Sequence, residues 1–162
     1  MSGHEPMPAL LAELHPMEHR SVLMDLLDCH PELQREAEKY AMEILTNVDV
    51  ESVANEVIDV FLGMDHTLIG TRSGRQPGRG YVHEVDAAWE LLNEAFGPFV
   101  VEVGRRRRLG LDDAARRFVD GVLTGLEEVR QTAGETTVFG WGPPDEAAAE
   151  LGAQIRNAVS SA

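Results

Sequence analysis

Apolar residues recur every three or four positions along most of this chain, and this spacing restricts the fold to helices that bury one face. A β-strand would need apolar residues at every second position, and no such pattern competes over a comparable length. The spacing is most regular over residues 50–62, where the acidic residues fall on the other side of the helix. The apolar positions there are Val50, Val53, Ala54, Val57, Ile58, Phe61 and Leu62. The sequence therefore predicts an all-α fold.

Capping residues and glycines mark where the expected helices begin and end. Asp49 is placed to cap the helix over 50–62, and Gly110 ends the helix over 84–108. The apolar pattern of this second helix keeps its phase across Pro98, although a proline removes one helical hydrogen bond. We therefore favour one kinked helix over two separate ones, which remain the alternative.

The whole pattern predicts about six or seven helices joined as antiparallel hairpins, which form a short HEAT-like stack or a helical bundle. We favour the stack. At 162 residues the chain has the size of about one domain. We expect a single helical domain over 1–162, with a long flexible loop at about 63–83 and a second loop at about 132–143. Gly121 and Gly125, four residues apart, predict that two helices approach closely.

One stretch of the sequence carries a resemblance to known proteins. The features are Tyr81, the AAWELL of 87–92, Pro98, the LGL of 109–111 and the GVLTGL of 121–126. In these features, residues 80–129 resemble uncharacterised bacterial proteins made of HEAT-like helical hairpins, some of them encoded beside SWIM-type zinc fingers. The resemblance implies stacked helical hairpins and brings no catalytic motif with it. The cysteines of a zinc finger are absent, because Cys29 is the single cysteine.

Hydropathy and cysteine usage define the expected environment of the protein. No apolar run approaches the roughly 18–20 residues needed to cross a bilayer, and no secretory signal is visible near the start of the sequence. Cys29 has no second cysteine with which to form an internal disulfide. These features predict a cytoplasmic protein without membrane association, in which Cys29 is buried and inert.

Charge is unevenly distributed along a chain whose formal net charge is −14. Residues 1–70 hold fourteen acids against three bases, whereas residues 71–117 hold nine arginines against seven acids. The excess of basic residues begins in the glycine-rich part of the expected loop at about 63–83, here called the Arg/Gly loop. We expect the arginines of this loop to meet an acidic surface. That surface belongs to the chain's own residues 1–70, to a second copy or to another protein. The candidate binding residues are Arg72, Arg75, Arg79, Tyr81, Arg105 and Arg106.

Two of these candidates belong to the run Arg105–Arg108 at the end of an expected helix. Cations at this end complement the helix dipole by roughly 0.3–1 kcal/mol each, and Glu102, Asp112 and Asp113 are near enough in sequence for local ion pairs. A binding patch shared with the loop is the alternative. Trp89 fits the buried face of its helix and, as an alternative, would anchor a partner. The acidic composition disfavours nucleic acid as a partner.

No pattern of catalytic or metal-ligating residues stands out, so we expect no metal and no cofactor. His15 and His19 have the spacing of zinc ligands on a helix, but His15 precedes a proline at a helix start. Glu90 and Glu94 lack the Glu-x-x-His pairs of a di-iron site, and we interpret them as a solvated acidic face. The sequence favours a non-enzymatic protein-interaction module that uses its Arg/Gly loop against an acidic surface. The alternative is a small-ligand or metal-dependent enzyme with its site between helices.

Overall fold

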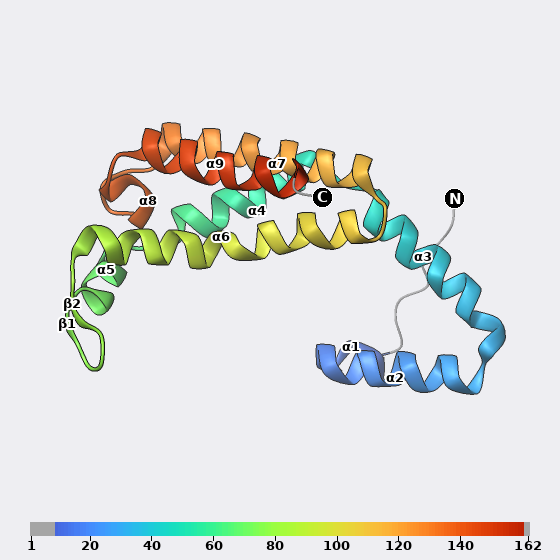
Figure 1. The fold of residues 1–162 in the computed structure, drawn as a ribbon. Coiled ribbons are helices and arrows are strands. Elements are labelled where there is room, and N and C mark those ends of the chain that lie inside the picture. Colours follow the sequence, from blue (N-terminus) through green and yellow to red (C-terminus); the bar gives the residue numbers. More distant parts are fainter. Residues whose placement is uncertain (1–8, 161–162) are drawn as a thin grey trace. The chain divides into compact units, whose positions relative to one another are not determined.

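The computed structural model describes residues 9–160 (Figure 1), and it confirms the all-α prediction. Within this range, helices make up nearly all of the regular structure, beside one small two-stranded sheet. The chain divides between Ile44 and Leu45 into two compact units, and each is described by itself. That they form the single domain expected from the sequence stays a prediction.

The first unit is built of helices that enclose no core. Its elements are α1 (Ala9–Ala12), α2 (Pro16–Cys29), the 3-10 turn η1 (Pro31–Leu33) and most of α3 (Gln34–Thr46). None of the residues 9–44 is buried. Cys29, the last residue of α2, is exposed. The prediction of a buried thiol is therefore wrong, because residues 9–44 form no apolar interior in which to enclose one.

The second unit holds the hydrophobic core. Its elements are α4 (Val50–Leu62), α5 (Thr67–Arg72), β1 (Gly74–Gln76), β2 (Gly80–Val82), α6 (Glu84–Arg108), α7 (Asp112–Thr132), α8 (Val138–Trp141) and α9 (Pro144–Ser160). The long helices α6, α7 and α9 pack against one another, and α4 packs mainly against α7 (Figure 1). The largest fully buried side chains include Phe61, Phe96, Phe139, Leu126, Leu151 and Ile155. The apolar faces of these helices of the second unit thus meet in one core.

Two glycines allow α4 and α7 to lie in close contact. A Cβ atom added at Gly121 would lie 2.7 Å from the Cβ atom of Val53. A Cβ atom added at Gly125 would lie 2.6 Å from the carbonyl oxygen of Ala54. Both distances are shorter than van der Waals contact, so no larger residue fits without moving the helices apart. The prediction of a close helix approach at these glycines is confirmed.

A single helix, α6, runs through Pro98 from Glu84 to Arg108. The preference for one helix over two is therefore confirmed. Pro98 itself is exposed, whereas Phe96 and Phe99 on either side of it are buried in the core. Burial of both neighbours explains why the apolar pattern keeps its phase across the proline, at the cost of one backbone hydrogen bond.

The segment 63–83, expected as a loop, contains the short helix α5 and the β1–β2 hairpin. The hairpin turn has Pro77 at its second position and Gly78, with a φ of 79°, at its third, as a type II turn requires. The N–H of Arg79 donates to the carbonyl oxygen of Gln76 at 3.2 Å and closes the turn. Strands of three residues are too short to show a period in the sequence. The flexibility of this segment stays a prediction.

The second expected loop, 132–143, contains α8. The Thr137 side chain caps this helix by accepting a hydrogen bond from the N–H of Gly140 at 3.1 Å. Val138 and Phe139 are buried, and the N–H of Val138 donates to the carbonyl oxygen of Met64 at 2.8 Å. The segment is thus ordered by the burial of its two apolar residues, which positions Trp141 at the end of α8.

Candidate functional site

The β1–β2 hairpin turns two of the predicted binding residues outward. Arg75 lies directly opposite Tyr81 in the antiparallel pairing, so their side chains emerge on the same face of the ribbon. Neighbouring residues along a strand point to opposite faces. Accordingly, Val82 is buried and Gln76 is half-buried. Arg75 is exposed, and Tyr81 keeps 69% of its surface accessible.

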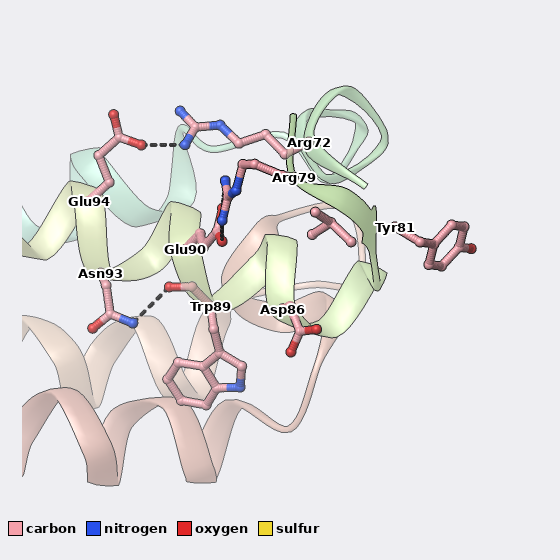
Figure 2. A pocket seen from close by; sticks show the side chains of 9 residues that line it. Arg72, Arg79, Tyr81, Asp86, Trp89, Glu90, Asn93 and Glu94 are labelled. Carbon is pink, nitrogen blue, oxygen red and sulfur yellow. Dashed lines mark hydrogen bonds and ion pairs between the residues drawn. The ribbon is translucent and has the colours of Figure 1, made fainter. Parts of the chain in front are cut away.

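The other two arginines of the segment are paired with carboxylates of α6 (Figure 2). Arg72 lies 2.6 Å from Glu94. Arg79 donates two hydrogen bonds to Glu90, at 2.5 and 3.2 Å, which is the two-pronged geometry that favours arginine over lysine. These hydrogen bonds lower the pKa of Glu90 below its ordinary value of 4.5 and raise the pKa of Arg79. The acidic surface met by these two arginines is therefore α6 of the same chain.

An open cavity of about 700 Å³ lies between the hairpin and α6. Both arginines extend across it toward their glutamates, whereas Tyr81 points out of it (Figure 2). Trp89 and Asp86 also line the cavity but point away from the ion pairs. The cavity is thus lined by both arginines and carboxylates. Its lining residues form no pair of a nucleophile and a base. This arrangement holds the hairpin against α6 and gives the cavity a polar lining.

Arg105 and Arg106 lie in the last turn of α6, far along the helix from the hairpin that precedes its first turn. Arg106 is buried, with its guanidinium bound to the Glu102 carboxylate and 4.6 Å from the centroid of the Phe118 ring. Arg105 lies 3.4 Å from Glu102. Arg105 and Arg106 therefore lie at the C-terminal end of the helix and form local ion pairs with Glu102, as one of the two interpretations of the sequence predicts. They do not share a patch with the hairpin.

Glu90 and Glu94 are the residues that sequence reasoning missed, because it interpreted them as a solvated face. The sequence feature that could have predicted their pairing is Pro77–Gly78, which is typical of a turn between two short strands. A turn there brings Arg79 back beside the start of α6. The half-buried Trp89 packs against the core, in agreement with its predicted place on the apolar face, and also lines the cavity.

Comparisons with known proteins found no relative of this chain. The chain matches no protein-family model, and neither curated proteins nor solved structures show a significant match to it. Among residues 9–160, no three or more His, Cys, Asp or Glu side chains are grouped to hold a metal ion. No helix in this part of the chain is long and apolar enough to cross a membrane.

We expect the carboxyl group of Glu90 to titrate below 4.5 in a nuclear magnetic resonance titration, and Arg79→Ser to return its midpoint toward that value. Since folding lowers this pKa, the pair stabilises the hairpin at neutral pH, and the stabilisation is lost as the pH falls through the lowered value. Arg116→Ser, which removes an exposed arginine of α7, should leave the Glu90 midpoint unchanged. A wild-type midpoint at or above 4.5 would contradict the pairing.

Proposed function

We propose that this protein is a non-enzymatic interaction module whose hairpin presents Arg75 and Tyr81 to an acidic surface on a partner. The observation that carries the proposal is the side-by-side exposure of these two residues on the outer face of the hairpin. Arg75 makes no ion pair or hydrogen bond through its side chain to the residues that the structure describes. Its charge is therefore available to a second molecule.

The residue types support an interface. Tyrosine and arginine are enriched among the residues that contribute most to protein–protein binding. The Tyr81 ring rests against the His83 ring, with 5.1 Å between centroids, which restricts its motion before any partner binds. The ion pairs of Arg72 and Arg79 hold the hairpin on α6. A partly ordered hairpin loses less conformational entropy on binding than a free loop.

The character of the cavity supports a module over the alternative enzyme. An enzyme site between helices calls for histidines and carboxylates that converge in an enclosed polar pocket. The cavity at the hairpin is open and is lined by arginine–glutamate pairs, with no histidine. The two arginines and their glutamates neutralise one another, so none of these four groups is poised to transfer a proton.

The remaining parts of the proposal rest on the sequence. The resemblance of residues 80–129 to HEAT-like helical hairpins favours a scaffold that presents a surface. The formal net charge of −14 favours a protein partner or a second copy over nucleic acid. A cytoplasmic setting follows from the cysteine usage, and it stays an expectation.

We expect the double substitution Arg75→Glu and Tyr81→Ser to weaken capture of partners at least about tenfold, which corresponds to about 1.4 kcal/mol. The wild-type protein would be immobilised and exposed to a lysate of its own cells, and the retained proteins would be quantified. Capture should also fall at high salt, because the screening length shrinks from about 10 Å at 0.1 M to about 3 Å at 1 M.

Arg20→Glu provides the matched control, since it makes the same charge change at an exposed position of α2. It should capture the wild-type set of proteins. Both variants should keep the wild-type helicity and thermal midpoint, because the substituted side chains are exposed. Undiminished capture of acidic proteins by the hairpin variant would contradict the proposal.

A further inference from the structure

A second surface lies around Trp89, where α6 meets α8 and α9. Trp89 lines the cavity at the hairpin and two adjoining hollows. One of these is a small apolar depression, here called the apolar socket, formed chiefly by Val85, Trp89, Trp141 and Pro143. The other is bounded by acidic residues of α9. Neither hollow is part of the hairpin face proposed to bind a partner.

The apolar socket is built by the tertiary fold. Val138 and Phe139 anchor α8 in the core, so Trp141 is brought to the same depression as Val85 and Trp89 of α6. Val85 keeps 57% of its surface exposed. The free volume is only about 50 Å³, far below the roughly 300–1,000 Å³ of small-molecule pockets. It suits one apolar side chain from a partner rather than a cofactor.

Carboxylates with free charge flank the socket. Asp86 of α6 lines the cavity on one side of Trp89, and Glu146 and Glu150 of α9 line the hollow on the other. No ion pair joins any of these three carboxylates to a residue in the range 9–160 that the structure describes. The nearby Glu90 and Glu94 are instead neutralised by Arg79 of the hairpin and Arg72 of α5. The rim of the socket thus presents carboxylates on both sides of Trp89 that are not engaged in these ion pairs.

We infer that the socket and its acidic rim, here called the aromatic groove, bind a basic segment of another protein. The segment carries one apolar anchor residue with lysine or arginine on both sides. The anchor enters between Trp89 and Trp141, where burial against indole rings removes its surface from water. The flanking cations meet Asp86 on one side and Glu146 and Glu150 on the other, which selects against acidic partners.

Intrinsic fluorescence provides a direct test, because the two tryptophans of the chain both line this groove. The probes are a pooled set of seven-residue peptides with leucine, isoleucine, methionine or phenylalanine at the centre and lysine or arginine elsewhere. We expect a saturable shift of tryptophan emission with at least one basic peptide. Matched peptides with glutamate flanks, or with serine at the centre, should produce no such shift.

Variants then locate the binding. Using a labelled form of the peptide that binds, Glu146→Gln with Glu150→Gln should raise the dissociation constant at least about tenfold, as measured by fluorescence anisotropy. The control pair Glu128→Gln with Glu135→Gln removes two exposed carboxylates that do not line the groove and should bind as the wild type does. Circular dichroism would verify that all variants are equally folded.

Four results would overturn the inference, and three of them concern peptide binding. These three are the absence of a shift with every basic peptide, equal binding of the serine-centred peptides, and equal loss of affinity in the control pair. Concentration-dependent self-association that blocks the peptides would identify a second copy of the chain as the occupant, against the inference. Because Arg75 is not among the residues that line these hollows, Arg75→Glu alone should bind the peptides normally. This outcome separates the groove from the proposed function of the hairpin.

Discussion

Replacing Phe61 by alanine will lower the free energy of unfolding by about 3–5 kcal/mol, which is the usual cost of removing a large buried aromatic ring. Phe61 is fully buried in α4. Its ring centroid lies 6.3 Å from that of Phe96 in α6 and 5.4 Å from that of Phe139 in α8. One side chain thus joins three helices, and its loss leaves a cavity that the surrounding rings only partly fill.

The effect is measured by thermal and urea unfolding, monitored by circular dichroism. We expect the thermal midpoint to fall by on the order of 10 °C or more. Phe61→Leu provides a milder second variant, which keeps part of the buried volume and should remain folded if the alanine variant does not. Val101→Ala, at a side chain that is 64% exposed on α6, should change stability by less than about 0.5 kcal/mol. Equal stability of Phe61→Ala and wild type would show that the ring is not part of the core.

Gly125→Ala will also destabilise the protein, although alanine is normally the better helix former. The added Cβ atom would lie 2.6 Å from the carbonyl oxygen of Ala54 and 2.7 Å from the Cβ atom of Val57. Neither neighbour can move alone, because one belongs to the backbone of α4 and the other is a buried β-branched residue. We expect a loss of about 1–3 kcal/mol, the typical cost of overpacking a core.

The matched control for this substitution is Gly104→Ala in the interior of α6. The nearest atom to an added Cβ there is the end of the flexible Arg108 side chain, at 3.4 Å. Alanine at that position should stabilise the helix by about 0.5–1 kcal/mol, since glycine loses more backbone freedom on folding. Opposite signs for the two substitutions in urea unfolding would demonstrate that the α4–α7 contact, and not helix propensity, determines the result. A stabilising Gly125→Ala would contradict that contact.

Part of the candidate site was accessible from the sequence and part was not. The concentration of Arg72, Arg75 and Arg79 in one segment of an acidic chain marked that segment as the candidate binding region. Which of these arginines would be paired within the chain was hidden, because their partners Glu90 and Glu94 are ordinary residues on an acidic helix face. Whether these arginines reach the glutamates depends on the direction in which the hairpin turns. That direction is set by a few backbone dihedral angles, which the composition of the segment does not determine.

Local periodicity by itself determined the long helices of this protein, because the residues that face a core repeat at the helical spacing and Pro, Gly and Asp mark the helix ends, but it missed the short helices α5 and α8. Gly121 and Gly125 also indicated a close helix approach, whereas the structure identified α4 as the partner of α7. Only the tertiary structure decided that Arg72 and Arg79 are neutralised while Arg75 has no side-chain partner within residues 9–160, and that Trp141 joins Trp89 at one depression. Those outcomes depend on contacts between residues far apart in sequence, whose energies no local pattern encodes.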